Sequence, residues 1–142
     1  MFIFDKMKSA QLLEKALDTA ALRQKIIANN ITNVDVPNFK RSEVNFESEL
    51  KRVINEKESE ESAIKALVTD SRHIPFSVPG NISSVKPKIN FDYTSSYRND
   101  GNNVDIEKEV VDASENQLKY NLFIQRINSI FSGIKKVMDG PK

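Results

Sequence analysis

ANNITNVDVPNFKR, residues Ala28 to Arg41, is the stretch of sequence that decides the fold. It follows a long segment with an apolar stripe, and it is dense in residues that end helices. Asn29, Asn30 and Asn33 can hydrogen-bond their own backbone and tolerate left-handed geometry. Pro37 cannot continue a helix and favours an extended residue before it. We therefore predict that a long N-terminal helix ends within this stretch and that a turn follows.

The segment before this turn has the heptad pattern of a helix that packs along one seam. Its apolar residues alternate at spacings of three and four, with Gln24 as the one polar member. Neither Gly nor Pro occurs from residue 1 to 36. These features predict a helix of roughly 27 residues, about 40 Å long. The predicted seam consists of Ala10, Leu13, Leu17, Ala20, Ile27, Ile31 and Val34.

A second heptad pattern near the other end of the chain predicts a long C-terminal helix, with Gln117 as its polar member. Acidic residues crowd its start and basic residues lie toward its end, which complements a helix dipole. Gly140 and Pro141 are typical of the end of a helix. The predicted seam consists of Ile106, Val110, Ala113, Tyr120, Ile124, Ile127, Phe131, Ile134 and Met138.

The C-terminal helix also carries a second apolar stripe, which consists of Phe123, Ile130 and Val137. A two-helix hairpin needs one seam, so this extra width favours either the middle of the chain or another subunit as a partner. The polar members of the two seams suggest a further hypothesis, in which an antiparallel pair places Gln24 opposite Tyr120. Such a polar layer would fix the register of the pair at some cost in stability.

The middle of the chain is less regular. Helical spacing of Phe46, Leu50, Val53 and Ile54 predicts a weaker helix within residues 43–68, whereas prolines interrupt residues 71–103. Alternation in residues 89–93 predicts a short strand, and residues 99–103 predict a turn. The expected fold is mainly α, with long terminal helices in an antiparallel, coiled-coil-like hairpin. We divide the chain into an N-terminal helix (1–35), a turn, short helix and irregular or extended connector (36–103), and a C-terminal helix (104–142).

Composition excludes several classes of function. The chain has no cysteine and a single histidine, His73, so thiolate chemistry and multi-histidine metal sites are excluded. Four glycines cannot build a phosphate-binding loop, and a net charge of +1 argues against a nucleic-acid binder. Residues 70–73 contain acid and base groups, but catalytic sites are recognised by geometry and not by adjacency. We expect no enzyme activity, cofactor, metal or membrane span, and no cleavable signal peptide is visible.

Several collinear motifs resemble those of flagellar axial proteins, the rod and hook subunits. The motif N-N-I-x-N-x-D-x-P-x-F-K, which runs from Asn29 to Lys40, is similar to their N-terminal signature. Residues 98–107, RNDGNNVDIE, and 116–120, NQLKY, are similar to segments before and within the C-terminal helix of FlgB-type rod subunits. Residues 16–25 and 69–74 also fit this family. The matching positions expected to act in assembly are Asn29, Asn30, Asn33, Asp35, Pro37, Phe39, Lys40, Asp100, Gly101, Asn102, Val104, Asp105 and Tyr120.

The resemblance implies a structural subunit of the proximal rod of the flagellar basal body. It implies export by the flagellar type III apparatus without a cleaved signal, a place in the periplasmic rod, and contacts with copies of itself, other rod subunits and the membrane ring and export-gate complex. The subunit would transmit torque from the ring complex to the distal rod. Phe46 and Leu50 resemble a short export-gate motif. Asn38 stands where the family often has Gly, and Asn tolerates the positive φ of such a turn.

One alternative remains open from the sequence: a soluble helical-hairpin export chaperone or adaptor. It would share both seams and the lack of catalytic residues. It should fold alone with stable helices, whereas a rod subunit should have poorly ordered termini until neighbours complete its helices.

Overall fold

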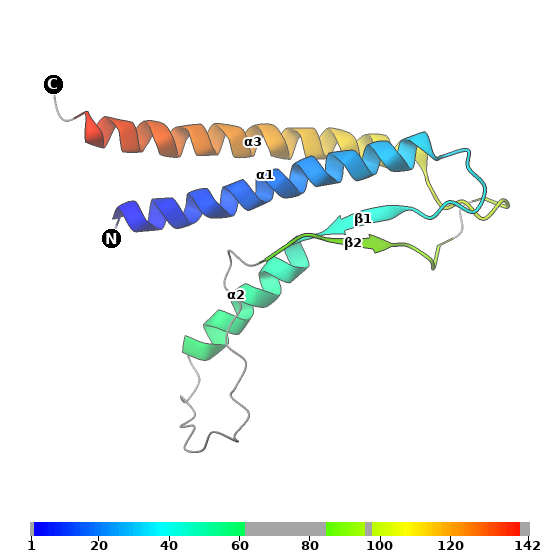
Figure 1. Ribbon diagram of the computed structural model, residues 1–142, viewed down its shortest axis with the longest axis horizontal. Coiled ribbons are helices and arrows are strands. Elements are labelled where there is room, and N and C mark those ends of the chain that lie inside the picture. Colours follow the sequence, from blue (N-terminus) through cyan, green and yellow to red (C-terminus); the bar gives the residue numbers. More distant parts are fainter. Residues whose placement is uncertain (1, 62–84, 96–97, 140–142) are drawn as a thin grey trace, which may run out of the picture. The chain divides into compact units, whose positions relative to one another are not determined.

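The computed structural model describes residues 2–61, 85–95 and 98–139 (Figure 1). Three helices and two strands follow in the order α1 (Phe2–Thr32), β1 (Ser42–Asn45), α2 (Glu47–Glu61), β2 (Lys88–Phe91) and α3 (Ile106–Met138). The chain divides into two compact units, residues 1–44 with 89–142, and residues 45–88. The prediction of a mainly α fold with long terminal helices is confirmed.

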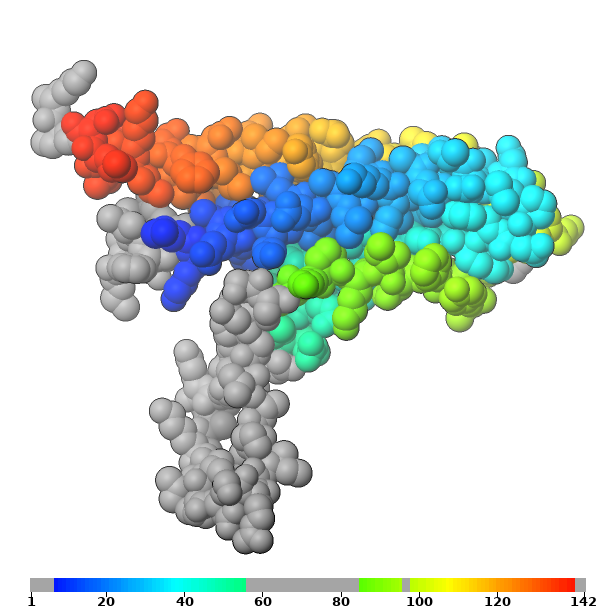
Figure 2. All heavy atoms as spheres, viewed as in Figure 1, coloured from blue at the N-terminus to red at the C-terminus, as the bar shows by residue number. Residues whose placement is uncertain are grey.

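Helices α1 and α3 of the first unit run side by side in opposite directions, so the predicted antiparallel hairpin is confirmed (Figure 1). Figure 2 shows side chains of α1, in blue, against those of α3, in orange, on one face of this pair. The predicted seam of α1 faces inward: Ala20 and Ile27 are buried, and Leu13, Leu17 and Ile31 are half-buried. Gln24 is exposed at the edge of this seam.

Helix α1 ends at Thr32, so Val34 lies in the turn beyond it and not in the helix as predicted. The end of the helix is closed by Asn33, whose backbone N–H donates to the carbonyl of Asn29 at 3.2 Å. The Asn33 side-chain amide donates to the same carbonyl at 2.7 Å. The Asn29 carbonyl thus accepts from both the backbone and the side chain of Asn33, as expected for an asparagine-rich helix end.

The seam of α3 differs from the prediction by a rotation of one heptad row. Its buried row contains Glu109, Asn116 and Ile130, with Phe123 half-buried on the same row. The predicted row one residue later is mostly exposed: Val110, Phe131 and Met138 are 52%, 58% and 80% exposed, Gln117 is also exposed, and Ile124 is half-buried. The predicted seam and the observed seam share one flanking row. In that row Ile106 is exposed, and four residues are half-buried: Ala113, Tyr120, Ile127 and Ile134.

The expectation for the second apolar stripe therefore needs correction. Phe123 and Ile130 belong to the seam with α1, and Ile130 is only 7% exposed. Only Val137 of that stripe is exposed, at 65%. The apolar surface that α3 leaves uncovered lies elsewhere on the helix.

The hypothesis of a polar layer is right that Gln24 meets a polar residue of α3 and wrong about which residue. Gln24 meets Asn116, whose side-chain amide donates to the Gln24 side-chain oxygen at 3.0 Å and to the Ala20 carbonyl at 2.9 Å. Gln117 instead donates to Asn121 on its own helix at 3.3 Å. Asn116 lies one helical turn before Tyr120, and it is buried whereas Gln117 is exposed, so the layer differs from the predicted one in both level and heptad row.

Helix α3 begins with a well-formed cap. The Asp105 carboxylate accepts from the backbone N–H groups of Glu107 and Lys108 at 3.0 and 3.3 Å, which satisfies donors that the first turn leaves open. At the other end, the Asp139 N–H donates to the Lys135 carbonyl at 2.9 Å. The predicted terminators Gly140 and Pro141 lie outside the described residues.

The second unit contains α2 and a small core. Residues 43–45 form part of β1 and not the start of a helix as predicted, because α2 begins at Glu47. The predicted helical spacing beyond that point is confirmed: Phe46, Val53 and Val85 form the buried core, with Leu50 packed against it. The predicted helix beyond Glu61, the prolines of residues 71–84 and the acid–base residues 70–73 lie outside the described residues.

Strands β1 and β2 pair as a two-stranded sheet. The predicted strand over residues 89–93 is confirmed in part, since β2 spans Lys88–Phe91 and exposes all four side chains. Phe91 contacts Tyr93 in a tilted ring pair with centroids 6.2 Å apart.

Candidate functional site

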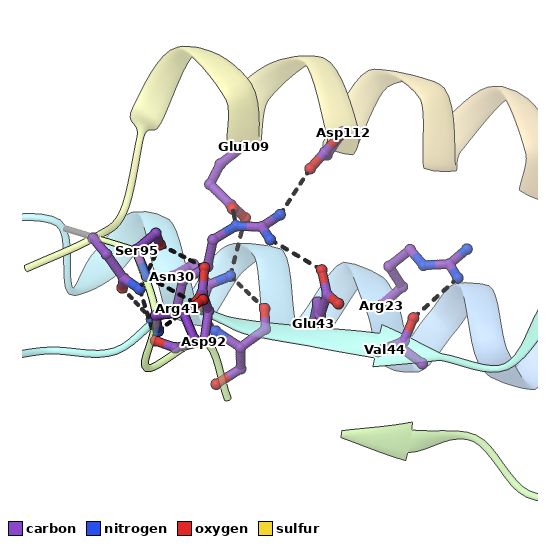
Figure 3. Close-up of polar contacts among 12 residues, drawn as sticks. Arg23, Asn30, Arg41, Glu43, Val44, Asp92, Ser95, Glu109 and Asp112 are labelled. Carbon is purple, nitrogen blue, oxygen red and sulfur yellow. Dashed lines mark hydrogen bonds and ion pairs between the residues drawn. The ribbon is translucent and has the colours of Figure 1, made fainter. Parts of the chain in front are cut away.

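The densest set of buried polar contacts lies where α1 ends, α3 begins and β1 runs beside α1 (Figure 3). We call this cluster the polar junction and define it by Asn30, Arg41, Asn102, Asn103 and Glu109. Asn30, Asn102 and Glu109 are fully buried. Buried polar groups are costly unless they are hydrogen-bonded, so each of these side chains needs partners.

Glu109 is the buried charge at the centre of the junction. One of its carboxylate oxygens accepts from Arg41 Nε at 2.5 Å, and the other accepts from the Asn30 amide at 3.1 Å. Arg41 reaches on to Asp112 at 3.0 Å and to the exposed Glu43 at 3.2 Å. The guanidinium therefore ties the segment after the turn to the first turns of α3.

The charge state of Arg41 is secured by these carboxylates. Burial alone would lower the pKa of the guanidinium, but the bond to Glu109 and the charges of Glu109, Asp112 and Glu43 outweigh burial and raise that pKa. Arg41 thus stays charged at any accessible pH. Arg41 is thus a permanently charged partner of the buried carboxylate, and removing Arg41 would leave Glu109 buried without a cation.

The side chain of Asn30 joins β1 to α1 by pairing with the backbone of Ser42 as a neighbouring strand would. Its amide donates to the Ser42 carbonyl at 2.8 Å, and its oxygen accepts from the Ser42 N–H at 3.1 Å. A second contact joins the same elements further along, where Arg23 donates to the Val44 carbonyl at 3.3 Å. The side chain of Asn30 therefore satisfies both backbone groups of a buried residue at once.

Asn102 lies in the segment before α3 and hydrogen-bonds to the turn that follows α1. Its amide donates to three carbonyl oxygens at distances of 2.9–3.0 Å. These acceptors belong to Asn33, Val34 and Val36. The Asn102 side-chain oxygen accepts from the Val104 N–H at 2.8 Å, so one residue both holds the turn after α1 and shapes the segment that leads into α3.

Asn103 joins three chain segments. Its oxygen accepts from the Arg41 N–H at 2.7 Å, and its amide donates to the Asp92 carbonyl at 2.7 Å and the Ser95 hydroxyl at 3.1 Å. Asp92 in turn accepts from the hydroxyl and N–H of Ser95 and from the hydroxyl and N–H of Thr94. The Ser95 hydroxyl and these other donors lower the pKa of the Asp92 carboxyl well below its ordinary value.

Two residues with positive φ approach each other closely at the tip of the junction. Asn38 has φ 59° and Gly101 has φ 81°. A Cβ atom on Gly101 would lie 2.7 Å from the Asn38 side-chain oxygen, so only glycine fits without a shift. The Asn38 N–H donates to the Asp100 carbonyl at 3.0 Å, and Lys40 donates to the Gly101 carbonyl at 2.7 Å.

The structure brings most of the motif residues expected from the sequence to this one place. Asn30, Asn33, Lys40, Gly101 and Asn102 make the bonds described above, and Asp105 caps α3. Asp35 and Asp100 both pair with Arg98, at 3.3 and 3.2 Å. The rest lie around it or further along the hairpin: Val104 is buried, Phe39 and Tyr120 are half-buried, and Asn29 and Pro37 are exposed.

Sequence reasoning did not single out three members of the junction: Arg41, Asn103 and Glu109. Arg41 directly follows the N-terminal motif and Asn103 lies inside the second one, so proximity to the motifs could have indicated them. Glu109 was attributed to the helix dipole because acidic residues crowd the start of α3. Its burial follows from a partner 68 residues away, which no local pattern reveals.

The junction holds segments together and offers no reaction chemistry of its own. Among residues 2–61, 85–95 and 98–139, no group of three or more His, Cys, Asp and Glu side chains could hold a metal ion. The described helices also include none that combines the length and apolar character needed to cross a membrane.

Comparisons with known proteins give one consistent result. A family model described as flagella basal body rod protein matches residues 11–40, which include the end of α1 and the turn after it. The flagellar basal body rod protein FlgB of Bacillus subtilis is 37% identical over 132 residues, 93% of this chain and 94% of that protein. FlgB of Borrelia hermsii is 47% identical over 116 residues, covering 81% and 84%. FlgB of Salmonella typhimurium is 30% identical over 139 residues, covering 97% and 99%.

Proposed function

Because the chain belongs to the FlgB family of flagellar basal body rod proteins, we propose that it forms the proximal part of the rod, between the membrane ring complex and the distal rod. It is a structural subunit of the basal body rod and not an enzyme. The alternative of a soluble export chaperone finds no support, because these relatives are rod proteins.

The observation that carries the proposal is the similarity to FlgB along nearly the whole chain, together with a hairpin whose outer faces are apolar in part. Residues such as Phe131, Leu118 and Leu122 are exposed in the single chain. A subunit that packs side by side with others would cover them, and head-to-tail packing without ring closure extends into a tube.

Membership of the same family supports a proposal for export and location. The subunit would pass through the flagellar type III apparatus without a cleaved signal and assemble in the periplasmic part of the basal body. There it would contact copies of itself, other rod subunits and the ring and export-gate complex, and it would transmit torque to the distal rod. Phe46 would act in export only while the chain is unfolded, because it is buried in the core of the second unit.

We further propose that the two terminal segments, 1–35 and 104–142, form the axial core, and that residues 36–103 connect them. The motif residues of the turn would then hold the end of the hairpin in the shape that a neighbour recognises. Phe39 is half-buried there and would be its apolar anchor. The seam residues Leu13, Leu17, Ile27, Ile31, Ile124, Ile127 and Ile134 would keep the hairpin closed.

The test replaces the chromosomal gene with variants and measures the protein in isolated basal bodies. Phe39→Ala or Phe131→Ser should remove the protein from basal bodies and abolish swimming while synthesis stays normal. Asn128→Ala, at another exposed position of α3, is the matched control and should assemble normally. Complete rods and normal swimming in both test variants would contradict the proposed assembly surface.

A further inference from the structure

An exposed apolar stripe lies on the face of α3 that points away from α1. Val111, Leu118 and Leu122 are 57%, 65% and 61% exposed. Their spacings of seven and four place them on adjacent heptad rows, on the opposite side of the helix from the buried row of Asn116 and Ile130. The hairpin seam does not use these residues, so they need another partner in the assembled protein.

We propose that this stripe binds the outward face of α1 in a second copy of this chain; the proposal rests on the rod function above. The outward face of α1 has a heptad pattern of its own, with spacings of three and four throughout. All its members are exposed: Gln11, Glu14, Asp18, Ala21, Lys25, Ala28 and Thr32. Two of them, Ala21 and Ala28, are small and one heptad apart, and small residues let a neighbouring helix approach closely.

The residues of the two faces lie at matching positions along the helix axis (their levels) when two hairpins stand side by side in the same direction. Within the hairpin Gln24 meets Asn116 and Asn30 meets Glu109, which fixes the level of α1 against α3. Two copies placed without an axial shift keep these levels. The α1 helix of one copy then runs antiparallel to the α3 helix of the next, with Ala21 beside Leu118.

The same alignment places Ala28 beside Val111. Val111 and Leu118, two of the three aliphatic side chains of the α3 stripe, thus meet a small residue of α1, whereas Leu122 lies at the level of Asp18. Knobs of this kind pack into the space that small residues leave on a facing helix. A partner with large residues at these positions would keep the two helices apart.

Charge supports the second copy as the occupant. At matching levels Lys25 faces Glu115, between the two apolar contacts, and Glu14 faces Arg126, beyond Leu122, so the charges are opposite in sign at both places. Glu115 and Lys119 are exposed and pair with each other at 3.3 Å in the single chain, so they can rearrange at low cost. The charges of the outer face of α1 thus complement those of the outer face of α3 within the apolar stripe and beyond one end of it.

Three exposed aliphatic residues are too few for a stable dimer in solution, which needs about 1,000 Å² of well-packed interface. The contact therefore forms in the assembled rod, where several weak contacts per subunit act together. The isolated protein should accordingly stay monomeric.

The absence of cysteine in the chain makes a direct test possible. The variant Ala21→Cys/Leu118→Cys is expressed in place of the native gene, and isolated basal bodies are oxidised and run on a non-reducing gel. A disulfide needs Cα atoms within about 7 Å, and within one hairpin these two positions point away from each other. We expect a ladder of linked copies that disappears on reduction.

The matched control is Ala21→Cys/Gln117→Cys, which moves the second cysteine by one residue to another exposed row of α3. It should give a ladder several-fold weaker. Equal ladders, a stronger ladder in the control or no ladder in assembled rods would overturn the proposed contact. Presence of the native protein in basal bodies is scored separately, so failure of the rod function and failure of this contact are distinguishable.

A charge exchange covers the case in which the cysteine variants fail to assemble. Lys25→Glu alone and Glu115→Lys alone should each lower incorporation into basal bodies several-fold. The double variant Lys25→Glu/Glu115→Lys should restore incorporation toward the native level. A double variant that incorporates no better than the single ones, or single variants that incorporate normally, would overturn the proposal.

Discussion

The two halves of the hairpin are stabilised in different ways. At the polar junction, three fully buried polar side chains each contact more than one chain segment. In the far half, Leu13 and Leu17 of α1 and Ile127 and Ile134 of α3 are only half-buried, and Ile130 is the one described residue of α3 there that is buried. The junction satisfies its own groups, whereas the far half leaves apolar surface uncovered.

This difference indicates that the two halves of the hairpin have different structural roles. A buried polar network is sensitive to any missing partner and therefore specifies one geometry. Half-buried aliphatic residues tolerate several arrangements and gain stability when a neighbour covers them. The junction thus defines the hairpin in the single chain, and assembly completes the rest.

The largest expected effect is the loss of Arg41. Arg41→Ala leaves the carboxylate of Glu109 buried without its cation, and breaking such a pair costs about 3–5 kcal/mol. Urea unfolding followed by circular dichroism measures this cost. Lys119→Ala, which removes an exposed ion pair of the same helix, should cost at most about 1 kcal/mol. Equal costs for the two variants would remove the energetic distinction between the junction and the surface.

Variants of two neighbouring residues in the far half should distinguish an effect on folding from an effect on assembly. Ile130→Ala should destabilise the isolated chain by about 2–3 kcal/mol, because Ile130 is buried in the seam. Phe131→Ala should change that stability by less than about 0.5 kcal/mol, because Phe131 is 58% exposed. In basal bodies we expect the Phe131 variant to incorporate poorly. A larger loss of stability for Phe131 than for Ile130 would show that the predicted row, and not the observed one, faces α1.

The close approach of Gly101 to Asn38 offers a smaller test of the junction. Gly101→Ala should cost about 1–2 kcal/mol, since it adds a clash with the Asn38 side chain at a positive φ. Asn38→Gly alone should change stability by less than about 0.5 kcal/mol, because glycine adopts the same conformation. The double variant should recover the part of the loss that comes from the clash. Thermal unfolding that finds no coupling between the two positions would show that their contact does not hold the tip.

The smallest effect concerns pH. Hydrogen bonds from Ser95 and Thr94 lower the pKa of Asp92 in the folded chain. Its contribution is therefore complete above the unfolded pKa of about 3.9 and is lost as pH falls below that value. Asp92→Asn should be less stable than the native chain at pH 7, and the difference should shrink on acidification. A difference that grows as the pH falls would contradict the sign of this shift.

Much of this fold could be predicted from the sequence, because long heptad patterns and capping residues are local signals. The row of α3 that is buried could not. Sequence patterns assign burial to apolar residues, and the row with Val110 and Phe131 is more apolar than the row with Glu109 and Asn116. The less apolar row is nevertheless the buried one, because Glu109 and Asn116 hydrogen-bond to partners on α1.

The candidate site shows the same limit. Motif residues such as Asn30, Gly101 and Asn102 could be singled out because their types suit turns and caps. Their partners could not, since Arg41 and Glu109 are 68 positions apart and each has an ordinary local role. Strand β1 was also missed, because three residues before a helical pattern carry too little information to separate strand from helix.

Segment-resolved hydrogen exchange on the isolated, purified chain tests the central claim most directly. We predict the slowest exchange at the junction, in residues 26–33 of α1 and its end and 107–117 of α3, and faster exchange in residues 7–17 and 123–138 of the same helices. In assembled rods the far segments should become as protected as the junction. Uniform protection along both helices of the isolated chain, or slower exchange in the far half than at the junction, would contradict the account.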